Sequence, residues 1–209
     1  MKIIEGKQAT PEWWECRRGI PSSSNFDRII TPKKGDYSSQ AQGYICELLA
    51  DNALHYAPVD VEKYMSRDMQ WGVDTEGEAR KYYSMDRDTD IRQVCLCLTD
   101  DERFCCSPDG LIGDDGLLEL KCPTAKTHVQ YLLGGELPVE YKAQVHGQLF
   151  VTGRKWVDFM SYVPGMPTLL IRVEPDEFTE KLAECLEKFH EAFVSAKARM
   201  DELYPGWSA

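Results

Sequence analysis

The segment CSPDGLIGDDGLLELKCP, Cys106 to Pro123, decides the fold expected for this chain. It reads as two short apolar strands joined by the turn GDDG. Side chains alternate along a strand, so in LLELK Leu118 and Leu120 share one face while Glu119 and Lys121 share the other. Asp109 stands at the end of the preceding strand, beside a proline and a glycine that fix the turn. If the two strands pair, Asp109, Glu119 and Lys121 converge on one point.

Two acids and a lysine in otherwise apolar strands need a chemical explanation, because burying an unpaired charge is costly. Two clustered carboxylates repel each other and require a cation to keep both ionised. Mg2+ typically takes one or two carboxylates together with water and phosphate oxygens. A lysine beside the metal can orient or deprotonate the attacking water, so the group predicts metal-assisted hydrolysis of a phosphodiester. Taken alone, the pattern also fits a solvent-facing strand with a Glu–Lys pair and an Asp-Gly turn.

The composition bounds the class of protein. The chain has 209 residues, 43% of them hydrophobic, which suffices for one well-packed domain. Its formal net charge of −11 argues against a protein that coats nucleic acid through a basic surface. The first 34 residues nevertheless hold seven Lys or Arg against four Asp or Glu. That local excess fits a confined DNA track on an acidic body.

The eight cysteines lack the spacing of a zinc site, because their close pairs are C-x-C and C-C and the four histidines are scattered. Cys95, Cys97, Cys105 and Cys106 lie in apolar, strand-like runs, where cysteine behaves as a small buried hydrophobe. The N-terminal segment has no apolar core of signal-peptide length, and no run is long enough for a membrane span. We therefore expect reduced thiols and a cytoplasmic protein without membrane association.

The pattern along the chain predicts one domain, residues 1–209, with an α/β (α+β) core. Its parts are a helical N-terminal part to about residue 68, a core of about 69–175 and a C-terminal helix of about 176–204. The core begins with a helix over QWGVDTEGEARKYYSM and continues with the short strands of a central mixed sheet. The residues of that helix expected to face inward are Trp71, Ala79, Tyr82 and Tyr83.

Several separate motifs, taken in order, make the pattern specific. SPDG is followed by LELKCP and preceded by WGVDTEGEAR, while TPEWWECRRG and SSSNF lie near the start and YLLGGELPVEYKAQVHGQLFVTG follows the core. Together they span roughly Pro11 to Gly153. They resemble the phage lambda exonuclease, or YqaJ-like viral recombinase, family of the PD-(D/E)XK nuclease superfamily. The C-terminal helix matches only in general character.

This resemblance implies a central mixed β-sheet flanked by helices and a Mg2+-dependent 5′→3′ exonuclease acting on linear double-stranded DNA with a 5′ phosphate. Such an enzyme generates 3′ single-stranded tails for phage-type homologous recombination, by in-line attack of a metal-bound water. The resemblance further implies two Mg2+ ions, with Mn2+ as a possible substitute, and a homotrimeric ring around DNA. A single-strand DNA annealing partner and a phage or prophage gene in a bacterial host are also implied.

The resemblance also assigns roles in the core. Asp109 and Glu119 fall on the metal ligands of the family, the backbone carbonyl of Leu120 joins them, and Lys121 positions the water.

Two flanking residues complete the expected catalytic set. Glu76, four residues after the glycine of the W-G pair, falls on a further family acid, with Glu78 as a competitor. Gln144 falls on the glutamine of the family's A-Q-V-Q segment, where YKAQVHGQ departs after the valine. This glutamine is expected to hydrogen-bond the water or to hold Lys121.

The family also grips a terminal 5′ phosphate with an arginine and two serines, which suits the bidentate geometry of arginine on phosphate. These fall on Arg17, Ser24 and Ser107. Because RGIPSSS departs from the family pattern, the residues Arg18, Ser22 and Ser23 compete for these roles.

Further DNA contacts are expected outside the phosphate pocket. Lys33 and Lys34 are candidate backbone contacts, and Met69 lies where the family inserts an apolar wedge into the duplex end. Three other functions remain open: a related endonuclease, a single-strand nuclease, and a catalytically inactive DNA-end-binding protein.

Overall fold

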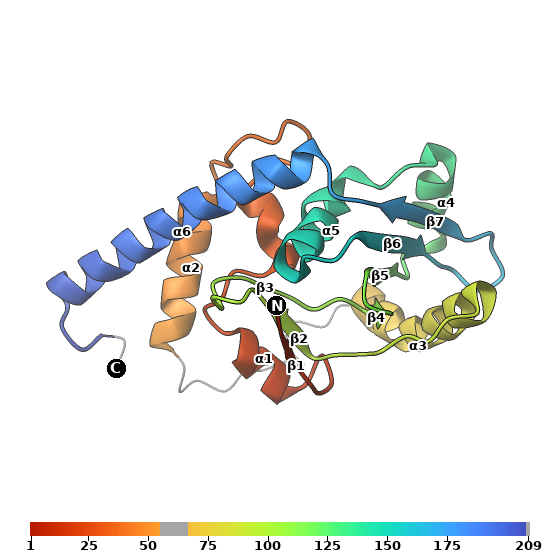
Figure 1. Cartoon of the computed structure of the whole chain (residues 1–209), viewed down its shortest axis with the longest axis horizontal. Helices are drawn as coiled ribbons and strands as arrows, with labels where there is room; N and C mark the ends of the chain where they lie inside the picture. Colours follow the sequence, from red (N-terminus) through yellow and green to blue (C-terminus); the bar gives the residue numbers. More distant parts are fainter. Residues whose placement is uncertain (55–66, 208–209) are drawn as a thin grey trace.

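The computed structural model describes residues 1–54 and 67–207, and for residues 67–69 and Val73 it describes the backbone alone. None of the helices in these residues combines the length and apolar character that a membrane crossing requires. Figure 1 shows their arrangement. In chain order the elements are β1 (Lys2–Ile4), α1 (Pro11–Arg17), the 3-10 helix η1 (Ser23–Arg28), α2 (Ala41–Ala53), α3 (Arg67–Arg87), β2 (Leu96–Leu98), β3 (Cys105–Cys106), β4 (Gly110–Ile112), β5 (Gly116–Lys121), α4 (Ala125–Gly134), α5 (Val139–Thr152), β6 (Trp156–Ser161), β7 (Leu169–Val173) and α6 (Glu177–Leu203).

A four-stranded sheet contains β4 and β5, the two strands of the segment Cys106 to Pro123. Its order is β4-β5-β6-β7, with β5 and β6 parallel and the other two pairs antiparallel. Parallel neighbours need a long connection, and here it runs through α4 and α5 (Figure 1). A smaller antiparallel sheet has the order β1-β2-β3. The mixed sheet flanked by helices that the sequence predicts is confirmed.

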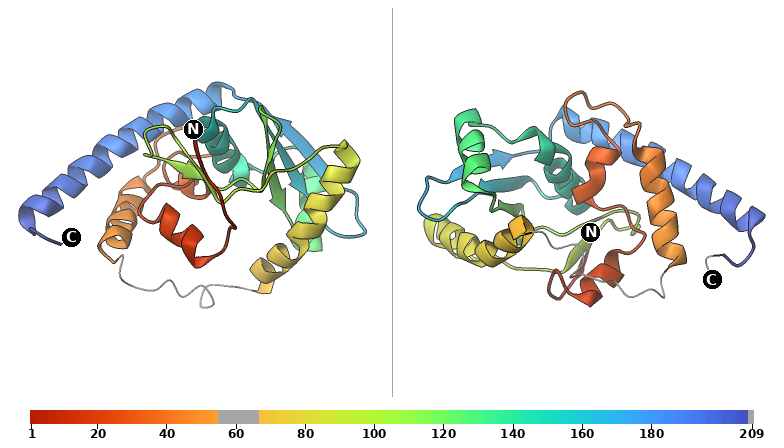
Figure 2. Two further views of the ribbon diagram at one scale, coloured as in Figure 1. Left: turned by 60° about the horizontal axis from the view of Figure 1, so that its bottom comes forward. Right: turned by 180° about the vertical axis from the view of Figure 1, so that it is seen from behind.

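Different helices cover the two faces of the four-stranded sheet, as the left view of Figure 2 shows. On one face, Ala79 and Tyr83 of α3 pack in one apolar cluster with Leu118 and Leu120 of β5. On the other face, Leu117 belongs to a larger cluster that includes residues of α5, α6, η1 and α2. The alternation read from LLELK is therefore present, with Leu118 and Leu120 toward α3 and Glu119 and Lys121 toward α5.

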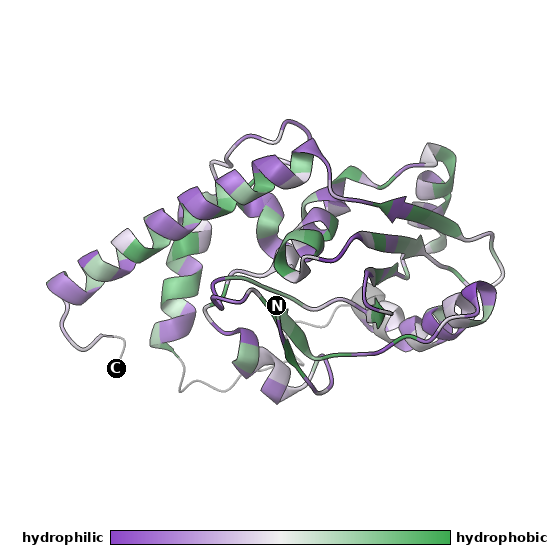
Figure 3. Cartoon of the chain, in the orientation of Figure 1, coloured by the Kyte–Doolittle hydropathy of each residue, from purple (hydrophilic) through white to green (hydrophobic). Residues whose placement is uncertain are grey.

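Hydropathy follows these layers (Figure 3). The strands of both sheets are largely apolar, whereas α6 alternates hydrophobic and hydrophilic positions along its length. The inward residues of α6 include Leu182, Leu186 and Phe189, spaced three or four apart. The prediction of a long amphipathic C-terminal helix is confirmed.

The inward face of α3 differs from the one predicted. Ala79 and Tyr83 are buried, but Trp71 is 45% exposed and Tyr82 is 42% exposed. Successive helical residues differ by about 100° around the axis, so Tyr82 cannot share the buried stripe of Tyr83. The ring of Tyr82 instead packs on that of Tyr162, with centroids 5.4 Å apart.

The N-terminal part is less helical than the sequence indicates. Strand β1 pairs with β2 and was not predicted, because three residues are too few to display an alternating pattern. The segment SSNFDR, Ser23–Arg28, forms a 3-10 helix. Helix α1 begins with a threonine cap, since Thr10 accepts the Trp13 N–H and proline occupies the first turn.

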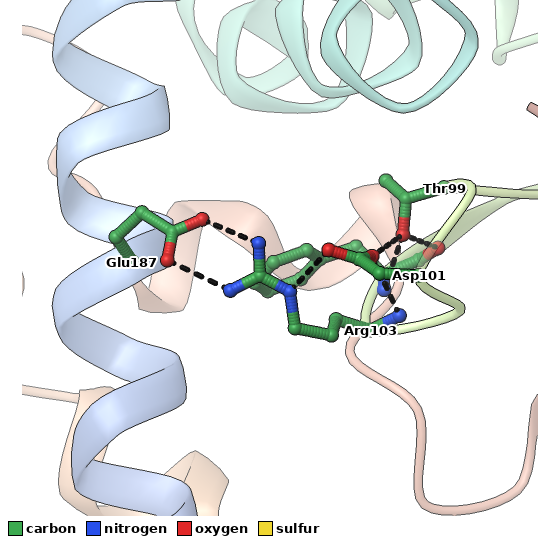
Figure 4. Close-up of polar contacts among 5 residues, drawn as sticks. Thr99, Asp101, Arg103 and Glu187 are labelled. Carbon is green, nitrogen blue, oxygen red and sulfur yellow. Dashed lines mark hydrogen bonds and ion pairs between the residues drawn. The ribbon is translucent and has the colours of Figure 1, made fainter.

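The turn between β2 and β3 is tied to α6 by a charged network (Figure 4). Both Nη atoms of Arg103 donate to the Glu187 carboxylate at 2.7 Å, and Arg103 Nε donates to Asp101 at 2.5 Å. The Thr99 hydroxyl donates to Asp101 at 2.6 Å. The small sheet and the C-terminal helix are thus joined outside the apolar core.

Candidate active site

Glu119 lies on the face of β5 that is turned toward α5, and it is 1% exposed. Its Oε1 accepts hydrogen bonds from Lys121 Nζ at 2.5 Å and Gln144 Nε2 at 2.6 Å. Its Oε2 accepts one from Gln148 Nε2 at 2.5 Å. Residues four apart lie on one side of a helix, so α5 presents both amides to the same carboxylate. Three donors therefore fix this buried carboxylate in one position.

Asp109 lies between β3 and β4, beside the end of β5. Its Oδ2 accepts the N–H of Leu120 at 2.6 Å. The N–H and C=O of one strand residue point to the same side of the strand, so the Leu120 carbonyl is directed to the side of β5 on which Asp109 lies. The structure thus brings Asp109, Glu119, Leu120 and Lys121 together, as the sequence predicts.

Helix α3 adds an acid and an arginine. Glu76 forms an ion pair with Arg80, one turn further along α3, and Arg80 Nε donates to the backbone carbonyl of Asp109 at 3.1 Å. Glu78, the competitor of Glu76, instead accepts the Tyr162 hydroxyl at 2.7 Å. Sequence reasoning did not select Arg80, although its spacing of four from Glu76 was an available signal.

Negative charge exceeds positive charge at this end of β5. Three carboxylates, those of Asp109, Glu119 and Glu76, face the two cations Lys121 and Arg80. Burial, followed by the charges of Glu119 and Glu76, raises the pKa of Asp109 well above its ordinary value. Burial alone would lower the pKa of Lys121, but the charges of Glu119 and Asp109 outweigh it and raise that pKa. The group therefore carries an excess of negative charge, which a further cation would neutralise.

The donor atoms fit a divalent metal. In the described part of the chain, no group of three or more His, Cys, Asp and Glu side chains is arranged so that it could hold a metal ion by itself. Mg2+ sites, however, often consist of one or two carboxylates completed by water and phosphate oxygens. Two carboxylates and a backbone carbonyl are the hard oxygen ligands that Mg2+ and Mn2+ prefer. The raised pKa of Asp109 agrees with a site that lacks positive charge.

A second group of polar residues joins α1, η1 and the SPDG segment. The guanidinium of Arg17 stacks 4.3 Å from the centre of the Trp13 ring and donates to Ser24 Oγ at 3.3 Å. The indole Nε1 of Trp13 donates to Ser107 Oγ at 2.8 Å. The predicted residues Arg17, Ser24 and Ser107 are therefore linked through Trp13, which sequence reasoning did not include in the pocket.

The competitors for this pocket have other surroundings. Ser22 and Ser23 are 3% and 2% exposed, whereas Ser24 is exposed. Arg18 forms an ion pair with Glu15 at 2.6 Å and donates to the Leu54 carbonyl at 3.0 Å. The arrangement favours Arg17 and Ser24 over their neighbours.

Lys33 and Lys34 are exposed in the loop between η1 and α2. They line a hollow of about 590 Å3 together with Val139 and Glu140, the first residues of α5. The next residue of α5, Tyr141, has its ring centre 5.0 Å from Lys121 Nζ. This loop therefore borders the end of α5 nearest Lys121. The wedge candidate Met69 has a side chain outside the described residues.

Comparison with known proteins points to one family. The family described as the YqaJ-like viral recombinase domain matches residues 12–155. No curated protein matches the chain significantly.

Solved structures agree with this match. An alkaline exonuclease (LHK-Exo) from Laribacter hongkongensis is 29% identical, with a TM-score of 0.74 over 93% of this chain and 100% of its own. The same exonuclease in complex with dAMP is 28% identical with the same TM-score and coverage. A phage-related exonuclease from Haemophilus somnus, 15% identical with a TM-score of 0.62 over 87% of this chain and 96% of its own, shares the fold. The fold is that of the PD-(D/E)XK-type exonucleases.

Proposed function

Because the chain belongs to the YqaJ-like viral recombinase domain family, we propose that it is a divalent-metal-dependent 5′→3′ exonuclease of linear double-stranded DNA. Family membership and the alkaline exonuclease neighbours support a deoxyribonuclease of the lambda exonuclease type. The metal, the strand polarity and the duplex substrate are the finer parts of the proposal.

One observation carries it: Asp109, Glu119, Leu120 and Lys121 meet at the end of β5, with Glu119 held by three donors. A carboxylate buried so completely has no structural need to be there, because the neighbouring Leu117 shows that the same face accepts an apolar side chain. Metal-assisted hydrolysis would explain why the acids, the carbonyl and the lysine lie together.

The residues divide the chemistry as follows. Asp109, Glu119 and the Leu120 carbonyl would hold one or two Mg2+ or Mn2+ ions, with Glu76 beside them. A bound divalent ion supplies charge that stabilises the phosphoryl oxygens and makes water a better nucleophile at neutral pH. The Lys121 ammonium holds the attacking water in line and neutralises charge that develops on phosphate. Gln144 helps to fix the position of Glu119 relative to Lys121, since both Gln144 and Lys121 donate to Glu119 Oε1.

The phosphate pocket sets the polarity of digestion. Arg17, Ser24 and Ser107 would receive the terminal 5′ phosphate, and water would attack the next phosphodiester. The P–O3′ bond breaks, which releases a nucleoside 5′-monophosphate and leaves a new 5′ phosphate on the shortened strand. That new end fits the same pocket, so digestion can continue. The relative solved with dAMP carries a mononucleotide of this kind.

The family resemblance supports three further parts of the proposal. The chain would act in the cytoplasm of a bacterial host of a phage or prophage. Three copies would close a ring around DNA, since ring closure retains a substrate without sequence contacts. The 3′ tails would pass to a single-strand annealing protein. The chain is proposed to fold as one domain throughout residues 1–209.

The proposed activity can be tested on two substrates, linear duplex DNA and covalently closed circular DNA. Each is incubated with the enzyme in the presence of Mg2+ or of a chelator. We expect loss of linear duplex only, and only with the metal. Cutting of closed circles would identify an endonuclease instead, and absence of any metal-dependent cleavage would contradict the enzyme.

A further inference from the structure

Gln148 is a buried polar residue that the proposed catalytic set leaves out. It is 0% exposed, and its Nε2 lies 2.5 Å from Glu119 Oε2. Its own Oε1 is buried and has no hydrogen-bond partner among the described residues. The amide orientation follows from this contact, because the opposite orientation would place two oxygens against each other.

Stability does not explain an amide at this position. A buried acceptor without a partner is unfavourable, and an apolar side chain of the same volume would avoid that loss. Val145, Leu149 and Val151 are buried on the same helix, so α5 also presents apolar side chains to the core. The amide must therefore serve the carboxylate that it contacts.

The acceptor positions on the Glu119 carboxylate indicate what the Gln148 amide does for it. Each carboxylate oxygen offers about two acceptor positions. On Oε1 both are taken, by Lys121 and Gln144. On Oε2 one is taken, by Gln148. Among the described residues nothing occupies the other acceptor position of Oε2, the oxygen that Gln148 orients.

We propose that Gln148 is a positioning residue that fixes Glu119 so that Oε2 is the oxygen offered to a divalent cation. This inference rests on the proposed function, because it assumes that Glu119 is a metal ligand. It gives the two glutamines different tasks. Gln144 shares Oε1 with Lys121, whereas Gln148 alone governs the metal-facing oxygen.

The positioning role of Gln148 can be tested by isothermal titration calorimetry of Mn2+ binding to the full chain without DNA. The variant Gln148→Met keeps the volume and removes the donor. We expect Mn2+ to bind it about 10- to 100-fold more weakly, as is typical when a ligand loses its supporting hydrogen bond. The matched control is Val151→Ala on the same helix, which is buried in the apolar core and has no side-chain atom that could hydrogen-bond Glu119. It should lower the melting temperature and leave the affinity unchanged.

The outcomes separate the two proposals. Wild-type affinity in Gln148→Met would overturn the positioning role while leaving the proposed function intact. Absence of Mn2+ binding in the wild type would overturn both. If Gln148→Met does not fold, Gln148→Asn replaces it, because a side chain shorter by one methylene group cannot reach Oε2. Unchanged Mn2+ affinity in that variant would equally contradict the inference.

The metal dependence of activity provides a second readout. In Gln148→Met the Mn2+ concentration for half-maximal digestion should rise about tenfold or more, with kcat recovering at saturating Mn2+. A residue that only stabilised the fold would lower the amount of active enzyme without moving that concentration.

Discussion

At the scale of single residues, two neighbouring arginines of α1 show how the fold separates a candidate ligand from a structural cation. Arg18 is engaged by Glu15 and by the Leu54 carbonyl. Arg17 stacks on Trp13 and reaches Ser24, and none of the described carboxylates forms an ion pair with it. A guanidinium held by a ring and a hydroxyl is available for phosphate, which it can bind through two parallel hydrogen bonds.

Replacing Arg17 tests the phosphate pocket. We expect Arg17→Ala to raise KM about 10- to 100-fold for duplex ends with a 5′ phosphate, because a charge-assisted hydrogen bond contributes about 1.5–3 kcal/mol. Ends with a 5′ hydroxyl should be digested almost as by the wild type. Steady-state kinetics on matched duplexes provide the measurement. Arg18→Ala is the control, and an equal effect of both substitutions on both kinds of end would refute the assignment.

The residues at the end of β5 and Gln144 were predictable, whereas the other residues that support them were not. The alternation in LLELK places Glu119 and Lys121 on one face whatever the surrounding fold. Gln148, Arg80 and Trp13 act across segments distant in sequence, and each looks like an ordinary helix residue. Only the packed structure shows that Gln148 reaches Glu119, 29 residues away.

At the scale of elements, α5 and η1 are packed without space between them. A Cβ added at Gly147 would lie 2.5 Å from a ring carbon of Phe26 and 3.0 Å from Ser23 Cβ. This close contact joins α5, whose Gln144 and Gln148 hydrogen-bond Glu119, to η1, which contains Ser24. The glycine therefore couples the proposed metal site to the proposed phosphate pocket.

Gly147→Ala should push η1 away from α5. We expect a loss of about 1–3 kcal/mol in the free energy of unfolding, measured in urea, because overpacking a core costs that much. Digestion of 5′-phosphorylated duplex should fall as well. Gly134→Ala, where an added Cβ meets nothing within 4 Å, is the matched control and should not destabilise the fold. Equal free energies of unfolding for the two variants would contradict this, because they would mean that η1 can move away from α5 at no cost.

The network of Figure 4 gives stability a pH dependence. A hydrogen bond from Thr99, followed by those from Arg103, lowers the pKa of Asp101 to about 2. A group with a lowered folded pKa stabilises the fold above its unfolded pKa, about 4, and loses this contribution as pH falls toward 2. Because Asp101 is largely exposed, the contribution should be below about 1 kcal/mol.

Asp101→Asn checks this by urea unfolding between pH 3 and pH 6. The free-energy difference between wild type and variant should be constant near pH 6 and shrink as the pH falls below about 4. A difference that grows on acidification would contradict the assigned direction.

The elements themselves were largely predictable, because their signals are local. The cap at Thr10, the GDDG turn and the apolar stripe of α6 each need only a few neighbouring residues. The exceptions have non-local causes. Strand β1 exists because β2 offers it an edge. Trp71 and Tyr82 are exposed because the sheet that α3 covers accepts only the stripe of Ala79 and Tyr83.

At the scale of the whole molecule, an acidic chain places cations where a DNA backbone would run. The formal net charge is −11, yet Arg17, Lys33, Lys34 and Lys121 lie around the proposed pocket and site. Such a distribution would attract DNA to the proposed pocket and site, while the acidic remainder of the surface would repel it. Fold and family follow from the order of the motifs, but charge placement follows from how the N-terminal part folds over the sheet.

The most direct test of the proposed hydrolysis uses a linear duplex with a 5′ phosphate on only one strand, incubated with Mg2+ and either the wild type or Lys121→Ala. We expect the wild type to shorten the phosphorylated strand from its 5′ end and to release nucleoside 5′-monophosphates. Lys121→Ala should bind the duplex and cut at least about 100-fold more slowly. Shortening from the 3′ end, or undiminished cutting by Lys121→Ala, would contradict the central claim that the residues at the end of β5 hydrolyse DNA from a 5′ phosphate.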